Sequence, residues 1–389
     1  MRQVLSTERI PIKLWLDDIE EGALEQAKNM ANLPFSFHHI AIMPDSHQGY
    51  GMPIGGVLAT KGVIVPNAVG VDIGCGMCAL KTSLQETNTK VLKKIMGGIR
   101  KMVPVGFDHH KERQDENLMP SSENIVKGGI VERQYPAALK QIGTLGGGNH
   151  FIEIQKGSDG NIWIMIHSGS RNIGLKVAEY YNRVAKKLNE RWYSEIPSSW
   201  QLAFLPIETQ EAKDYMTEMQ YCVDFAFMNR KLMMENIKLA FADELKDKLS
   251  ELEFVNIAHN YARWENHFNT NVIVHRKGAT SAQEGETGII PGSQGTKSYI
   301  VKGKGNNESF NSCSHGAGRA LSRKKAQNSL NLEDEIAKLD NQNIIHAIRN
   351  SKDLDEAPGA YKNIDVVMEN QKDLVDIEVE LTPLAVIKG

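Results

Sequence analysis

The chain has 389 residues, of which 41% are hydrophobic and 24% charged, and its formal net charge is −3. This balance is ordinary for a globular protein, and it excludes the strongly basic surface with which proteins grip long stretches of nucleic acid. No run approaches the ~20 apolar residues of a transmembrane helix, and the first residues lack the apolar core of a secretory signal. Four cysteines are too few for a disulfide framework, so we expect a cytoplasmic protein with no membrane partner.

The first part of the chain predicts a helix, a stretch of strands and a polar excursion. Residues 16–32 have helical periodicity and open with acidic residues, which favour a helix N-terminus. Residues 38–80 alternate short apolar runs with glycine turns, which is typical of strands joined by functional loops. Residues 88–101 also predict a helix. Residues 106–133 are polar and highly charged, and we expect them to form a surface excursion.

The second part predicts long helices between short strands. Two helices are expected over residues 171–190 and about 208–250, separated by a Pro/Ser/Trp stretch at 195–207. The pattern also predicts a helix from Gly316 onward, opened by Gly-Ala-Gly-Arg. Strands are expected at 152–154 and 162–166 as a pair, near 253–258, 271–275 and 297–302, and in the C-terminal stretch 375–387.

Candidate metal ligands and catalytic residues are spread from position 72 to position 315, across both halves of the chain. Two independent modules would each contain a complete set of such residues, which neither half does. We therefore predict one intertwined catalytic domain over residues 1–389. Its fold class is α+β, with central β-sheets flanked by helices.

The run Val69-Gly-Val-Asp-Ile-Gly-Cys-Gly-Met77 places a carboxylate, Asp72, and a thiol, Cys75, in a glycine-punctuated turn. Glycine lets the backbone bend sharply, so side chains from distant segments can meet at one point. A turn Asp that caps backbone amides and a buried Cys are the structural alternative. Together with several imidazoles, however, the pair predicts a transition-metal site that could hold two ions bridged by sulfur.

Six of the twelve histidines lie in short motifs that contain Gly or Asn, and one such histidine alone is more often structural than a ligand. Six in one chain make a purely structural explanation improbable, but the sequence leaves open which of them bind metal. Ligand softness alone favours zinc for a Cys/His/Asp site. These histidines are His47, His150, His167, His259, His275 and His315.

Four glycine-containing turns combine hydroxyl groups with a cation, as phosphate-binding loops do. Each is weak evidence alone, because Gly-Ser-Gly turns are common, but together they suggest that more than one phosphate is bound. The cations Arg319, Arg323, Lys324 and Lys325 could equally form a solvated helix face. The four turns are 168–171, 276–280, 291–296 and 316–319.

Taken together, these motifs resemble the RtcB family of RNA-splicing ligases in its compact bacterial form. They occur in the family's order over nearly the whole chain. Gln294 stands where many relatives carry Met, which puts little in doubt. The matching runs are Asp45-Ser-His-Gln-Gly-Tyr-Gly-Met-Pro-Ile-Gly-Gly-Val57, the run from Val69 to Met77, Gly146-Gly-Gly-Asn-His-Phe-Ile-Glu153, His167-Ser-Gly-Ser-Arg171, His259-Asn260, His275-Arg-Lys-Gly-Ala-Thr280, Pro291-Gly-Ser-Gln-Gly-Thr296, His315-Gly-Ala-Gly-Arg319 and Lys388-Gly389.

The resemblance implies a ligase that uses GTP and Mn²⁺ to join an RNA 3′-phosphate or 2′,3′-cyclic phosphate to a 5′-hydroxyl. By motif position, His315 would carry GMP as a covalent intermediate, which then yields an RNA 3′-diphosphate-guanosine. Two Mn²⁺ ions would be held by Asp72, Cys75, His150, His167 and His259, with Cys75 bridging. The resemblance also implies RNA ends as partners, and it allows an activating protein.

Further roles come from the resemblance alone. Glu153 would accept hydrogen bonds from guanine, Lys388 would donate to its O6, and Tyr361 would stack on the base. RNA phosphates would be held by Arg171, Lys277 and Arg319. The remaining nucleotide-binding positions would be Asn149, Asn260, Pro291, Gly292, Ser293, Gln294, Ser298, Gly316, Ala317 and Gly318.

Two other functions use the same residues. A dinuclear metal phosphoesterase would need the five ligands but neither His315 as a nucleophile nor a guanine pocket. An RNA-end-binding protein without turnover would share the fold, although intact ligands and an intact His315 weigh against it. The motifs do not separate tRNA splicing from the repair of damaged RNA.

Overall fold

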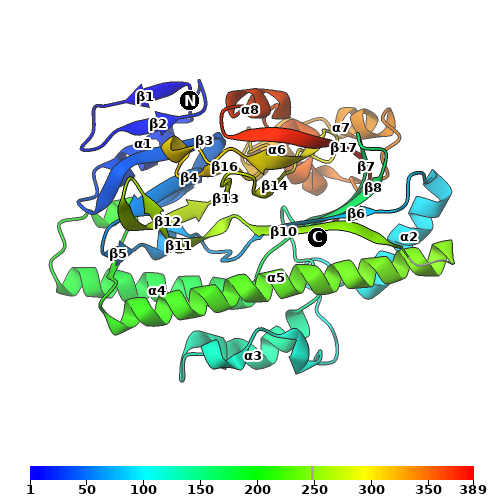
Figure 1. Cartoon of the computed structure of the whole chain (residues 1–389). Coiled ribbons are helices and arrows are strands. Elements are labelled where there is room, and N and C mark those ends of the chain that lie inside the picture. Colours follow the sequence, from blue (N-terminus) through cyan, green and yellow to red (C-terminus); the bar gives the residue numbers. More distant parts are fainter. Residues whose placement is uncertain (247–248) are drawn as a thin grey trace.

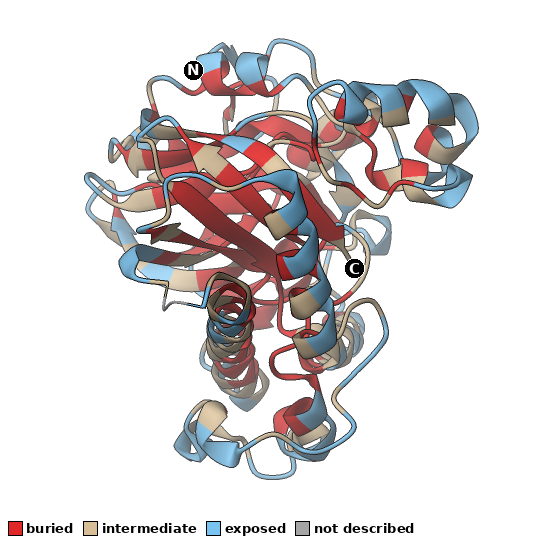
Figure 2. Cartoon of the chain, turned by 90° about the vertical axis from the view of Figure 1, so that its right-hand side faces the viewer, coloured by how far each residue is buried: buried red, intermediate tan, exposed pale blue. Residues whose placement is uncertain are grey.

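The computed structural model describes residues 1–246 and 249–389, which form a mixed α+β fold, as predicted. Two large sheets occupy the centre and helices cover them, so that buried residues lie on the strands and exposed residues on the outer shell (Figure 2). None of the helices within the described residues combines the length and the apolar run that a membrane span needs. The α-helices are α1 (Glu21–Ala31), α2 (Thr89–Met102), α3 (Ile130–Gln141), α4 (Arg171–Arg191), α5 (Gln210–Leu245), α6 (Arg323–Ser329), α7 (Leu332–Asp340) and α8 (Ile364–Asn370).

The first sheet has six strands, and only its β2–β3 pair is parallel. Its long strand β3 carries the Asp45–His47 motif into the middle of the molecule and turns back as β4. In spatial order, the strands are β1 (Gln3–Leu5), β2 (Ile12–Leu14), β3 (Ser36–Tyr50), β4 (Met52–Thr60), β12 (Thr270–Lys277) and β11 (Asn260–His267).

The second sheet has seven antiparallel strands, and its edge strands β10 and β14 also contact each other, so that it curls toward a barrel. Two further pairs, β13 (Ala279–Ser281) with β16 (Ser312–Ser314) and β5 (Val63–Ile64) with β9 (Leu205–Pro206), connect the layers. In spatial order, the seven strands are β10 (Glu251–Ala258), β6 (Gly76–Thr82), β8 (Ile162–Ser168), β7 (Phe151–Gly157), β17 (Val375–Lys388), β15 (Ser298–Gly303) and β14 (Thr287–Ile290).

Helix α5 is the longest element, with 36 residues, and it begins where the Thr209 hydroxyl accepts a hydrogen bond from the Ala212 N–H. It packs against strands β6, β8 and β10 of the second sheet. Helices α4 and α5 run side by side along the sheets, and α3 lies outside them (Figure 1).

The structure confirms most of the predicted elements to within a few residues. Helix 88–101 is α2, helix 171–190 is α4, and the strand pair at 152–154 and 162–166 is the β7–β8 ladder. The helix predicted at 16–32 begins later, at Glu21, and that predicted at 208–250 ends at Leu245; residues 247 and 248 lie outside the described residues. The strands predicted at 253–258, 271–275, 297–302 and 375–387 are β10, β12, β15 and β17.

The helix predicted from Gly316 was wrong. Residues 316–322 form a loop, and α6 begins only at Arg323, where the Ser322 hydroxyl caps it. The reason is the close approach of Gly318 to β3: a Cβ on Gly318 would lie 2.1 Å from the Asp45 carbonyl oxygen, and its φ is +74°. This backbone contact requires glycine in the left-handed region and is incompatible with a helix.

Gly74 is a site where this packing can be tested. Its φ is +75°, and a Cβ would lie 2.8 Å from Val223 Cα on α5. We expect Gly74→Ala to destabilise the chain by about 1–2 kcal/mol through its backbone conformation and by about 1–3 kcal/mol more through the clash. Urea unfolding in the presence of a chelator measures this without any contribution from bound metal.

Gly62→Ala is the matched control, because Gly62 has a φ of +70° but nothing within 4 Å of its Cβ position. It should show only the backbone cost. Equal losses in the two variants would contradict the tight packing of α5 on the Gly74 turn.

Candidate active site

Five predicted ligands converge at one end of the second sheet. Neighbouring antiparallel strands alternately begin and end at the same end of a sheet. Four of the ligands therefore lie at one end of the second sheet: Cys75 before β6, His150 before β7, His167 in β8 and His259 after β10. Cys75 Sγ lies 3.5 Å from His150 Nε2 and 3.3 Å from His167 Nε2. His150 Nε2 is 3.2 Å from Asp72 Oδ2, so the half-buried carboxylate completes the cluster.

The other ring nitrogen of two of these histidines is held by a backbone carbonyl. His150 Nδ1 donates to Leu145 O over 2.9 Å, and His167 Nδ1 donates to Asn149 O over 3.1 Å. This fixes the proton on Nδ1 and leaves the Nε2 lone pair facing Cys75, as the hydrogen-bond partners of metal-bound histidines commonly do. Burial lowers the pKa of His167 and of His259 well below 6.5, so both rings stay neutral.

The donor set fits a metal site. Among the described residues, two groups of three side chains have ligand atoms within 4.8 Å of one another, and both contain Cys75. One group adds His167 and His259, and the other adds Asp72 and His150. Without a cation, burial and then the Asp72 charge raise the pKa of the Cys75 thiol, so a bound metal would be needed to stabilise the thiolate.

Arg230 lies beneath this cluster, and sequence analysis missed it. Its guanidinium is fully buried on α5 and donates to Gly74 O over 3.0 Å and to Ser168 O over 2.8 Å. Asn256 accepts from its Nε. Arg230 thus joins the loops that carry Cys75 and His167, and its charge lowers the pKa of the thiol against the larger effect of burial. Only the helical periodicity around it was visible in the sequence.

His315 faces the same region from the other side. The Asp45 carboxylate is buried, and its Oδ2 accepts from His315 Nδ1 over 2.6 Å and from His315 N over 3.2 Å. Burial opposes ionisation of Asp45, but the charge of His315 and this hydrogen bond lower its pKa. Nε2 of His315 is therefore the free nitrogen, and its ring lies 4.8 Å from the ring of His259. Sequence analysis gave Asp45 no role, although it opens a motif.

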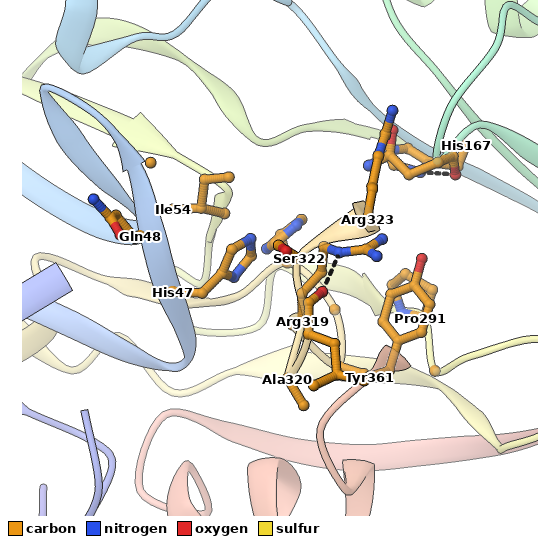
Figure 3. Close-up of a pocket in the computed structure, with 18 of the residues that line it drawn as sticks. His47, Gln48, Ile54, His167, Pro291, Arg319, Ala320, Ser322, Arg323 and Tyr361 are labelled. Carbon is orange, nitrogen blue, oxygen red and sulfur yellow. Dashed lines mark hydrogen bonds between the residues drawn. The ribbon is translucent and has the colours of Figure 1, made fainter. Parts of the chain in front are cut away.

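A cavity of about 510 Å³ opens beside His315 and His167. Figure 3 shows His47, Arg319, Arg323 and Tyr361 around it, with His167 beyond Arg323. The loop that replaced the predicted helix supplies one wall. The nucleotide-binding positions that line this cavity are Asn149, Pro291, Gly292, Gly316, Ala317, Gly318 and Tyr361.

A smaller cavity of about 20 Å³ shares Phe151, Gly292 and Tyr361 with the first. Glu356 closes it, because its carboxylate accepts from Lys388 Nζ over 3.3 Å, from Arg319 Nη1 over 2.9 Å and from the Tyr361 hydroxyl. Burial raises the pKa of Glu153 in its wall to about 8. Ser293, Gln294, Val386 and Lys388 complete this cavity. No signal in the sequence singled out Glu356.

Two predicted nucleotide residues line neither cavity. The Ser298 hydroxyl accepts from Gly292 N. Asn260 joins the turn that carries Asp72 and Cys75 to the residue after β12, because it donates to Asp72 O and accepts from Gly278 N. His275 is also structural, since its Nδ1 donates to Leu58 O and its Nε2 accepts from Val65 N. His47, in contrast, lines the larger cavity.

The three cations expected at RNA phosphates are all engaged by the protein. Lys277 is buried, its Nζ donates to Tyr50 O over 2.6 Å, and burial lowers its pKa to about 7. Arg171 Nε donates to Thr144 Oγ1, and its backbone has a φ of +62°. Arg319 lines the larger cavity and pairs with Glu356. Their contacts with RNA stay a prediction.

Comparison with known proteins adds an independent finding. The family described as "tRNA-splicing ligase RtcB" matches residues 26–389. The chain is 40% identical to the RNA-splicing ligase RtcB of Escherichia coli strain K12, over 100% of the chain and 99% of that relative. It is 31% identical to the tRNA-splicing ligase RtcB of Thermococcus kodakarensis, over 98% of the chain and 95% of the relative.

Metal content tests the sharing of Cys75. We expect Cys75→Ala to lose all bound metal, because both ligand groups contain this thiol, and His150→Ala or His259→Ala to lose only the metal held by its own group. The chain is equilibrated with Mn²⁺ and desalted, and the metal bound per chain is measured by atomic emission.

Cys78→Ala is the matched control, since Cys78 is buried nearby but belongs to neither group. Retention of one full equivalent by Cys75→Ala would contradict the shared-ligand arrangement.

Proposed function

The chain belongs to the RtcB family of tRNA-splicing ligases, and on that premise we propose that it joins an RNA 3′-phosphate or 2′,3′-cyclic phosphate to a 5′-hydroxyl, using GTP and Mn²⁺. The observation that carries the proposal is the Asp45–His315 pair. The pair leaves His315 Nε2 free at a cavity that is also lined by His167, one of the predicted metal ligands. A dinuclear phosphoesterase would not need this imidazole as a nucleophile.

Two Mn²⁺ ions would be held by the residue groups of Cys75 with His167 and His259 and of Cys75 with Asp72 and His150. When bound, such ions neutralise charge on phosphoryl oxygens as a phosphoryl group moves. The choice of manganese over zinc follows from the family. The protein supplies neutral imidazoles, and the His315 ring lies only 4.8 Å from the ring of His259.

In the first step, His315 Nε2 would attack the α-phosphorus of GTP, forming a P–N bond as the bond to pyrophosphate breaks. Attack makes the imidazole cationic. The buried Asp45 carboxylate would stabilise this charge and keep the Nδ1 proton in place, as the Asp of a Ser-His-Asp triad does. The resulting phosphoramidate is reactive enough to pass GMP onward.

In the second step, an RNA 3′-phosphate oxygen would attack the bound GMP, which frees His315 and forms a 3′-diphosphate-guanosine end. A 3′-phosphate alone has no good leaving group, and this step creates one. The 5′-hydroxyl would then attack the RNA phosphorus, form the new phosphodiester and release GMP. A 2′,3′-cyclic phosphate must first be opened by water to the 3′-phosphate.

Guanine would bind at the smaller cavity, which would have to widen, because about 20 Å³ holds only about one water molecule. Glu153 would accept from N1–H and N2–H₂, Lys388 would donate to O6, and Tyr361 would stack on the ring. Lys388 and Tyr361 both bond to Glu356, so the base would have to draw them away from that carboxylate. This exchange favours guanine, whose O6 replaces Glu356 as the acceptor for Lys388.

RNA would be held through its ends. A net charge of −3 offers little to long duplexes, whereas Arg171, Lys277 and Arg319 lie near the centre of the site. A partner that draws Arg319 from Glu356 would free a guanidinium for phosphate. An activating protein stays a prediction, as does the choice between tRNA splicing and RNA repair.

The nucleotidyl step is tested with α-labelled GTP and Mn²⁺. We expect His315→Ala to abolish acid-labile protein labelling, because it removes the nucleophile. Asp45→Asn should slow labelling by about 10²–10⁴-fold, since the ring loses its orienting carboxylate. His109→Ala, at an exposed histidine, is the control. Wild-type labelling of His315→Ala would identify another carrier.

The pH dependence of GTP binding tests the guanine pocket. Burial raises the pKa of Glu153 to about 8, so its carboxyl is mostly protonated at pH 7 and cannot accept from both guanine donors. GTP affinity should therefore rise as the pH rises toward 8, by roughly tenfold per unit at most, and level off above it.

Titration calorimetry over pH 6–9 measures this, with Glu153→Gln as the matched variant because it removes the titrating group. We expect weak and pH-independent binding in that variant. A flat wild-type profile would place guanine away from Glu153.

A further inference from the structure

Phe107 is 98% exposed, the highest value among the large hydrophobic side chains of the described residues. Its backbone is nevertheless tied on both sides. Gly106 N donates to Gly146 O over 3.0 Å, and His110 N donates to Lys140 O over 3.0 Å. The ring is thus held out to solvent by an anchored loop rather than by a frayed segment. An apolar ring presented in this way is available for contact with a ligand.

The loop that carries this ring is also tied to the catalytic site. The bond from Gly106 N reaches Gly146, which opens the run that ends at the ligand His150. Gly106 O accepts from Arg171 Nη2 over 3.3 Å, and Arg171 begins α4 shortly after the ligand His167. The ring therefore stands on a loop beside the cluster of predicted metal ligands.

The segment around the ring is basic in sequence, although the whole chain is slightly acidic. Residues 100–113 contain four exposed cations and only two carboxylates, against a net charge of −3 for the chain. An exposed aromatic ring among cations is the combination with which proteins hold single-stranded nucleic acid. The cations are Arg100, Lys101, Lys111 and Arg113.

We propose that Phe107 is a stacking platform for single-stranded RNA, and that the base of a nucleotide next to the reacting end packs on its ring. This inference rests on the proposed function and adds the path of the strand outside the catalytic cavity. The contact is independent of sequence, because every base has a flat face. It also selects unpaired ends, since the bases of a duplex are stacked on each other.

The test is direct binding of short single-stranded RNA that ends in a 5′-hydroxyl or a 3′-phosphate and carries 2-aminopurine near that end. Wild-type protein should quench the fluorophore by stacking. Phe107→Ala should weaken binding about 5- to 100-fold and lose the quenching, whereas Phe107→Trp should keep both. Labelling by GTP alone should be unchanged in Phe107→Ala, which shows that the site is intact.

Tyr193→Ala is the matched control. Tyr193 is 91% exposed, but it follows the C-terminus of α4, a 21-residue helix that begins at the site and is about 30 Å long. Its removal should leave RNA binding unchanged. Phe107→Ala that binds and quenches like wild type would overturn the proposal and point to a protein partner at this ring.

Because binding is read without turnover, the two proposals fail separately. Quenching by a wild-type protein that never ligates would retain the stacking platform and reject the ligase. If Phe107→Ala ligates subsaturating RNA as fast as the wild type, the ligase would be retained and the stacking platform rejected.

Discussion

The buried guanidinium of Arg230 is the interaction on which the site depends. It joins the Gly74 turn to the end of β8, and it does so from α5, the helix that packs against β6, β8 and β10. No carboxylate pairs with it among the described residues, so its charge is balanced by carbonyl dipoles and by the anionic groups it lies near. Asp72 adds a negative charge nearby, as the Cys75 thiolate would once a bound metal stabilised it, which couples the stability of the core to the state of the ligand cluster.

A second constraint fixes the nucleophile. Asp45 is central to β3, and Gly318 packs its backbone directly against the Asp45 carbonyl. This contact brings the His315 loop to β3 and sets the Nδ1 hydrogen bond that leaves Nε2 free. The same loop forms the cavity wall. One backbone approach thereby positions the nucleophile, selects its tautomer and shapes the place where substrate would bind.

Much of this arrangement could be predicted from sequence, and the exceptions have physical reasons. Strands and long helices follow from periodicity, and the ligand motifs stand out because glycine and histidine are distinctive in turns. Gly316-Ala-Gly-Arg has the composition of a helix start, but its conformation is decided by a contact with a strand about 270 residues earlier. Arg230, Glu356 and the partner role of Asp45 depend on such long-range pairing, which no local pattern encodes.

The most direct test of the account is the position of GMP on the His315 ring. Asp45 occupies Nδ1, so the account requires the phosphoramidate to form at Nε2. Phosphorus NMR of the protein after reaction with GTP and Mn²⁺, combined with peptide mapping, distinguishes the two nitrogens. An Nε2-linked adduct on His315 is the predicted result. An Nδ1-linked adduct, or GMP on another residue in a protein that ligates RNA, would contradict the account.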